Sequence, residues 1–147
     1  MNANDAQFVR VYTREVGGVI ADNSLAVSGG AHNFDVIVEA EAGSVLGGSG
    51  APYQLSLTAF DWTTGDNAAP AAAFTFNVTE YFNSSTGTIQ KWPSYEENFR
   101  VTLTAPQATA LVGHVLQYTA VLISPPPGIG GQANIVSSVQ SPLFVLI

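Results

Sequence analysis

Apolar and polar residues alternate strictly through most of this 147-residue chain. In one clear example, Tyr53, Leu55 and Leu57 alternate with Gln54 and Ser56. A period of two places alternate side chains on opposite faces of a β-strand, so that one face can lie against a core. The same pattern predicts strands at residues 8–15, 33–41, 53–60, 74–79, 99–104 and 115–123.

Clusters of Gly, Asn, Asp, Ser and Pro separate these runs, and such residues favour tight turns. The 68–73 segment is predicted as a loop, and Pro106 suits the first turn of a short helix near 105–112. About eight short strands without a long helix indicate an all-β, single antiparallel sandwich. We expect a flexible segment at 1–6 and one domain at 7–147. The predicted core comprises Val36, Val38, Leu55, Leu57, Val101, Leu103, Tyr118 and Leu122.

The C-terminal half resembles the immunoglobulin-like superfamily at Phe99-x-Val101-x-Leu103, followed by Tyr118-x-Ala120. In that superfamily a tyrosine near the start of the penultimate strand precedes the second cysteine by two residues. Here Ala120 stands in the cysteine position. The residue that would face it is Val36 or Val38. The resemblance implies an immunoglobulin-like sandwich, and a jelly roll or another Greek-key sandwich is the alternative.

The last five residues are all apolar: Leu143, Phe144, Val145, Leu146 and Ile147. Successive side chains in a strand point to opposite faces, so they cannot all face one core. We expect Leu143, Val145 and Ile147 to face one way, and Phe144 and Leu146 the other. A strand that is apolar on both faces needs both faces covered. The segment is therefore predicted as an assembly contact, with burial inside one chain, under the N-terminal segment or the 68–73 loop, as the alternative.

Charge narrows the range of partners. Only 10% of the residues are charged, and four basic against eleven acidic residues give a net charge of −7. Nucleic acids and anionic membrane surfaces are disfavoured, because both attract clusters of Lys and Arg. The longest apolar stretch, 110–123, is interrupted by His114, Gln117 and Tyr118, so no membrane span is predicted. Residues 1–7 lack the basic and apolar regions of a signal peptide, which favours synthesis in the cytoplasm and leaves the final location open.

Catalytic residues are scarce. The chain has no cysteine, which excludes disulfides and thiolate chemistry. His32 and His114 are the two histidines, and each is predicted to be a surface or capping residue. Ser49 lies in a glycine-rich turn without the pattern of a nucleophile elbow. Glu39 and Glu41 share the polar face of a strand and are predicted to be solvated. We therefore expect no enzyme, no catalytic residues and no cofactor.

An acidic loop carries three oxygen ligands of the kind that calcium prefers, on Asp61, Asp66 and Asn67. Their spacing does not match an EF-hand loop. The favoured interpretation is an ordinary turn stabilised by local hydrogen bonds, so no metal site is predicted.

Three aromatic residues are candidates for ligand contact: Trp62, Trp92 and Tyr95. Trp92 and Tyr95 flank Pro93 in a segment predicted as a loop, because proline interrupts strand pairing. An exposed tryptophan or tyrosine can stack on a sugar ring or anchor a protein partner. The sequence favours a non-enzymatic structural or interaction module that self-associates, such as a building block or decorating subunit of a particle or virion surface. The alternative is a carbohydrate-binding module that uses these aromatic residues.

Overall fold

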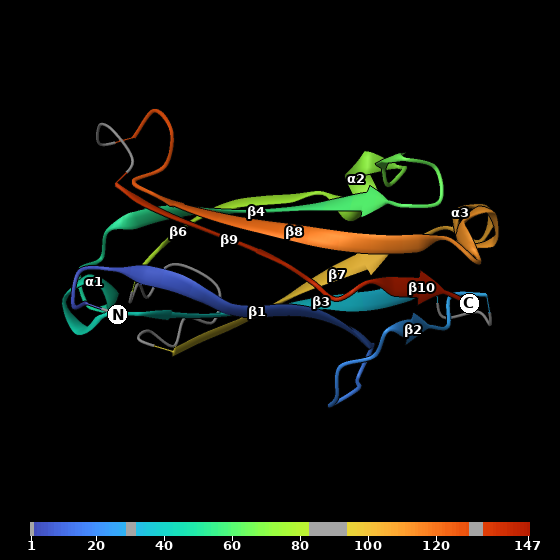
Figure 1. Cartoon of the computed structure of the whole chain (residues 1–147), viewed down its shortest axis with the longest axis horizontal. Helices are drawn as coiled ribbons and strands as arrows, with labels where there is room; N and C mark the ends of the chain where they lie inside the picture. The colour runs from blue at the N-terminus through green and yellow to red at the C-terminus, as the bar shows by residue number, and fades with distance from the viewer. Residues whose placement is uncertain (1, 29–31, 83–93, 130–133) are drawn as a thin grey trace.

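Two antiparallel layers of strands face one another along the length of the molecule (Figure 1). The computed structural model describes residues 2–28, 32–82, 94–129 and 134–147. The smaller sheet has the order β1-β3-β7, and the larger has the order β2-β10-β8-β4-β5, with β6 also paired to β4 and β9 to β8. The prediction of an all-β sandwich is confirmed.

The strands of the smaller sheet are long and antiparallel. They are β1 (Ala6–Glu15), β3 (Asn33–Ala42) and β7 (Ser94–Thr102). A β-bulge interrupts β1, because Phe8 pairs with Ala40 while Arg10 pairs with Glu39. Val9 is the extra residue and, like Arg10, is exposed. A bulge of this kind shifts the alternation by one residue, so Val11 and Thr13 can face the core beyond it.

The larger sheet is built around β4 (Pro52–Asp61) and β8 (Val115–Ser124). Two strands pair with successive parts of β4: β6 (Phe76–Tyr81) and β5 (Asp66–Asn67). Two others pair with successive parts of β8: β9 (Ile135–Gln140) and β10 (Phe144–Leu146). Ser141 and Pro142 separate β9 from β10. Pro142 has no N–H to donate, which accounts for the break in the ladder.

The C-terminal strand lies inside the sheet. Its neighbours are β8 on one side and the two-residue strand β2 (Ser24–Leu25) on the other, where the pairing is parallel. Phe144 and Leu146 point into the core, whereas Leu143 and Ile147 are about half exposed. The predicted division of this segment into two faces is confirmed. Its two sides are already paired within the chain, so it does not present an open sheet edge to a neighbour.

The predicted core is confirmed: all eight predicted residues are at most 4% exposed. Aromatic rings fill the centre, where the Phe34 ring lies 6.4 Å from that of Phe74 and 5.6 Å from that of Phe144. The Tyr118 ring stacks on Phe144 at 6.0 Å, and its hydroxyl donates to the Phe74 carbonyl at 2.8 Å. These contacts join both sheets.

The described part of the chain has three short helices at turns between strands: α1 (Ser44–Gly47), α2 (Ala71–Phe74) and α3 (Ala105–Leu111). The predicted helix near 105–112 is confirmed, and Thr104 begins it with a capping box formed with Gln107. The predictions of a loop at 68–73 and of a strand beginning at residue 74 were wrong in detail. Residues 71–74 form a helical turn, and the strand begins at Phe76.

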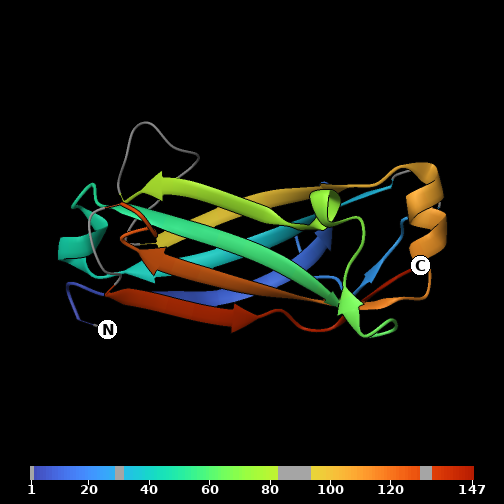
Figure 2. The same ribbon diagram turned by 90° about the horizontal axis from the view of Figure 1, so that it is seen from above.

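The N-terminal segment packs against α1. The Ala3 carbonyl accepts hydrogen bonds from the backbone N–H groups of Val45 and Leu46, and Ala6 already belongs to β1. Gly43 makes this approach feasible, because a Cβ atom there would overlap the backbone of Asn2 and Ala3. The N-terminus and α1 lie at one end of the sandwich, and the C-terminus and α3 at the other (Figure 2).

Candidate functional site

The predicted aromatic residues do not form one surface. Trp62, directly after β4, is 58% exposed, whereas Tyr95 is buried in β7 and contacts the core. The loop predicted around Tyr95 was wrong, because β7 begins at Ser94 and directs Tyr95 inward together with Phe99. Trp92 lies outside the described residues. Within the described chain, Trp62 is therefore the predicted aromatic residue that remains available to a ligand.

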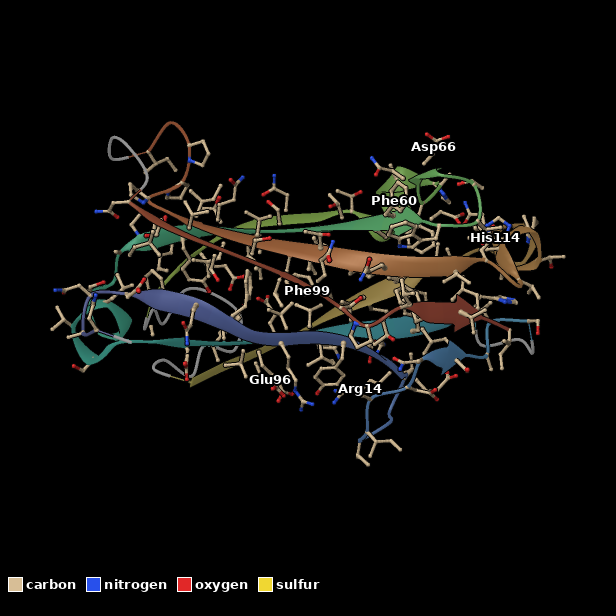
Figure 3. The ribbon with its side chains drawn as sticks, in the orientation of Figure 1. Arg14, Phe60, Asp66, Glu96, Phe99 and His114 are labelled. Carbon is tan, nitrogen blue, oxygen red and sulfur yellow. The ribbon has the colours of Figure 1, made fainter. Side chains whose placement is uncertain are left out.

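Trp62 borders a shallow hollow of about 350 Å³ on the outer face of the larger sheet. Its indole meets the Phe60 ring edge-on at 5.0 Å, and its Nε1–H donates to Gln117 Oε1 at 3.2 Å. Figure 3 shows Phe60 on this outer face and Phe99 between the sheets. The lining residues are Thr58, Phe60, Trp62, Asn67, Gln117, Thr119 and Gln140. The alternation in the sequence identified the polar positions of β4 and β8. It did not show that Gln140 of β9 lies beside them.

Asp61 and His114 form a pair at the end of the sandwich near α3. His114 Nδ1 lies 2.7 Å from Asp61 Oδ2, and the Asp61 side chain is 3% exposed. Burial alone would raise the pKa of Asp61, but hydrogen bonds from His114 and from the Thr63 N–H hold the pKa below its usual range. The pair lies beside a hollow of about 430 Å³. Among its described lining residues, Thr64 alone carries a hydroxyl, and that group donates to the Asp61 carbonyl.

The acidic loop is organised by Asp61. Its Oδ1 accepts from the Thr63 N–H at 2.9 Å, and Gly65 adopts a φ of 79°. These are the local hydrogen bonds of a turn, and the Asp61 carboxylate accepts them. Among the described residues, no group of three His, Asp or Glu side chains is placed to hold a metal ion.

The other candidate polar residues have structural partners. His32 Nδ1 lies 2.7 Å from the Val27 carbonyl, and the Ser49 hydroxyl donates to the Leu46 carbonyl at the end of α1. Glu41 accepts from the Gln7 amide at 2.6 Å. Glu39 accepts two hydrogen bonds from Arg10, which hold the pKa of Glu39 below its usual range.

The outer face of the smaller sheet gathers three of the four basic residues of the chain. Arg14, Asp35 and Arg100 are register partners across β1, β3 and β7, and Arg10, Glu39 and Glu96 form a second row. Arg100 Nε donates to the buried Asp35 carboxylate at 3.0 Å. Figure 3 shows Arg14 and Glu96 pointing outward on this side.

The loop between β1 and β2 projects beyond both sheets (Figure 1). Val19 and Ile20 near its tip are 88% and 74% exposed. Two hydrogen bonds hold the base of the loop together. The Asp22 N–H donates to the Thr13 carbonyl, and the Thr13 hydroxyl donates to the Asp22 carbonyl. The loop leads into β2, next to β10. We call the 16–23 loop together with β2 and residues 143–147 the β2–β10 corner. Its exposed apolar residues are Val16, Val19, Ile20, Leu143 and Ile147.

Within the part of the chain that the structure describes, no helix is both long and apolar enough to cross a membrane. Comparison with known proteins found no matching family model, no similar curated protein and no similar solved structure.

Proposed function

We propose that this chain is a non-enzymatic interaction module that self-associates, as a building block or decorating subunit of a larger protein assembly. The observation that carries the proposal is the exposure of Val19 and Ile20 at the tip of a projecting loop. Apolar side chains scattered over a surface are ordinary, but apolar residues gathered at one place are typical of a protein contact. Val16, Val19 and Ile20 lie close together in this loop, and Leu143 and Ile147 flank β10, which pairs with the strand that the loop enters.

The loop is suited to insertion because its base is fixed. The two hydrogen bonds between Thr13 and Asp22 join β1 to the segment that enters β2. Holding the loop in one conformation before binding lowers the conformational entropy that is lost on association. Burial of the Val19 and Ile20 side chains against a partner would contribute about 1.5–3 kcal/mol each.

Charge favours a second copy as the partner. The outer face of the smaller sheet sets Arg10, Arg14 and Arg100 against Asp35, Glu39, Glu41 and Glu96, so the face has a net charge of only −1. The rest of the chain then holds seven acidic residues and one lysine, which is most of the net charge of −7. The acidic surfaces of two copies repel each other, and this repulsion is weakest at the outer face of the smaller sheet. The 16–23 loop projects from the same side of the molecule.

The strand order supports the immunoglobulin-like assignment within this proposal. Such domains pair their first, second and fifth strands in one sheet and their third, sixth and seventh in the other. The order β1-β3-β7 fits the first sheet and the order β10-β8-β4 fits the second, with β10 taken as the continuation of β9. Tyr118 differs from the tyrosine corner of that superfamily, because its acceptor, Phe74, lies 44 residues earlier instead of a few.

Sedimentation of single aspartate variants tests the proposal. Wild-type protein is expected to sediment as an oligomer, and Val19→Asp and Ile20→Asp as monomers, because a charge at the contact would lose its water. Val45→Asp is the matched control, since Val45 is also exposed but lies in α1 at the opposite end. A wild-type monomer at high concentration, or loop variants that associate like the control, would contradict self-association through the corner.

The C-terminal strand needs its own probes. Leu143→Asp and Ile147→Asp change side chains that are half exposed, so they report on association while the fold is kept. Phe144→Asp and Leu146→Asp place a charge in the core and are expected to unfold the chain instead. Unchanged sedimentation of both exposed-position variants would remove β10 from the contact and leave the loop as its sole element.

A further inference from the structure

We infer that the hollow beside Trp62 is a binding site for a neutral saccharide. This site lies on the outer face of the larger sheet, separate from the proposed self-association contact, and does not depend on it. Its volume, about 350 Å³, lies near the lower end of the range of small-ligand pockets, about 300–1,000 Å³.

The lining carries no charge in a chain whose net charge is −7. The described residues around the hollow are two aromatic rings, three carboxamides and two threonine hydroxyls. An anionic ligand would need a cationic partner and a cationic ligand would need a carboxylate, and this lining offers neither. Carboxamides and hydroxyls both donate and accept hydrogen bonds, which matches the hydroxyl groups of a sugar.

The aromatic surface of the hollow matches the apolar face of a sugar ring. A pyranose ring has an apolar face of C–H groups and a rim of hydroxyls, so it packs on a flat ring while its rim meets polar side chains. Trp62 keeps 58% of its surface exposed, and its orientation is set by the edge-on Phe60 ring and the hydrogen bond to Gln117. A platform that is fixed before binding loses little entropy when the ligand arrives.

The carboxamide of Gln117 is held at both ends. Its Oε1 accepts from Trp62 Nε1–H, and its Nε2 donates to the Ser141 carbonyl at 2.9 Å. An amide oxygen has a second lone pair and an amide nitrogen a second hydrogen. Gln117 can therefore bind a ligand hydroxyl while both existing bonds persist.

The pairing register places the remaining polar groups in rows. Thr58, Thr119 and Gln140 are neighbours across β4, β8 and β9, and Asn67, Phe60 and Gln117 form the next row across β5, β4 and β8. Side chains in such rows stand about 5 Å apart. The hollow thus presents rows of polar groups beside Trp62, which suits a chain of linked sugar rings.

Nuclear magnetic resonance titration of the full chain with a panel of neutral oligosaccharides tests the inference. The panel contains β-1,4-linked hexamers of glucose, xylose, mannose and N-acetylglucosamine, and an α-linked glucan. We expect saturable shifts of the Trp62 indole and the Gln117 and Gln140 amide signals with at least one sugar. We expect weaker binding of a sulfated oligosaccharide, because no cation lines the hollow.

Two variants and one control complete the test. Trp62→Ala and Gln140→Ala are expected to weaken binding, the former by roughly tenfold or more. Tyr81→Ala is the matched control, because Tyr81 is an exposed aromatic residue of β6 that does not line the hollow. If Trp62→Ala changes amide signals throughout the chain, the fold itself is altered. The binding affinity of Gln140→Ala, a change at an exposed residue, then decides the outcome.

Three results would overturn the inference. One is the absence of shifts with every neutral sugar at roughly 10 mM, where binding with a millimolar Kd would be visible. Another is binding that the Tyr81 variant loses as strongly as the Trp62 variant. The third is a set of shifted signals that come from residues away from the hollow while the signals of its lining residues stay unchanged.

Discussion

Asp61 Oδ2 and His114 Nδ1 lie 2.7 Å apart although 53 residues separate them in sequence. The contact joins the end of β4 to the residue that precedes β8, next to α3. In the sequence, Asp61 was assigned to an acidic turn and His114 was predicted to be a surface or capping residue, with nothing to link the two. Together they join the two segments at one end of the sandwich.

Stability is expected to fall as the pH drops below about 4. The pKa of Asp61 lies below its usual value in the folded chain, so the folded state binds this proton less readily than the unfolded state. The stability contributed by the carboxylate is present above its unfolded pKa, about 3.9, and is lost as the pH falls through the lower folded value. Urea unfolding at a series of pH values would measure this loss.

Asp61→Asn is the variant for that measurement. It should lower the free energy of unfolding at neutral pH by about 1–3 kcal/mol and flatten the acid dependence. Asp66→Asn in the same loop is the control, because Asp66 is exposed. An acid dependence as steep in Asp61→Asn as in wild type would show that other carboxylates cause it.

Millimolar calcium is expected to leave the melting temperature unchanged. A ligand that binds only the folded state raises it, but the Asp61 carboxylate is already bound by His114 and by the Thr63 N–H. Melting curves in calcium, in magnesium and in a chelator would test this. A rise specific to calcium would establish a site in the 61–67 loop.

Leu103→Ala should lower the free energy of unfolding by about 2–5 kcal/mol, because it removes packed methyl groups and leaves a cavity. Leu103 is 4% exposed and belongs to the core. Leu143→Ala, at a half-exposed position, is the matched control and should change stability by less than about 0.5 kcal/mol in denaturant melts. Equal effects at the two positions would mean that Leu103 does not face the core.

Tyr118→Phe should cost about 1–3 kcal/mol, because it leaves the buried Phe74 carbonyl without the hydrogen bond that it accepts at 2.8 Å. The ring and its stacking on Phe144 are kept, so the loss reports on the hydroxyl. Tyr81→Phe removes a hydroxyl from an exposed tyrosine and serves as the control. A loss no larger than that of the control would indicate that water replaces the hydroxyl.

Local pattern determined the strands and the core. The alternation in 53–60 and 115–123 predicted β4 and β8 within one or two residues, and the capping residues Thr104 and Gln107 agree with the short helix. These features depend on neighbours a few positions away. The side chain of Leu57 or Leu122 points inward because of its place in a period of two, whichever strand lies opposite.

Tertiary structure decided which surfaces exist. The sequence could show that Phe144 and Leu146 share one face of a strand, but not that β2, more than a hundred residues earlier, covers the edge of β10. Tyr95 and Trp62 looked equivalent in the sequence, yet one is buried and the other borders the hollow with Gln117 and Gln140. Such contacts depend on the order and register of strand pairing. Many pairings satisfy the same alternation, and only the packing of the whole core selects one of them.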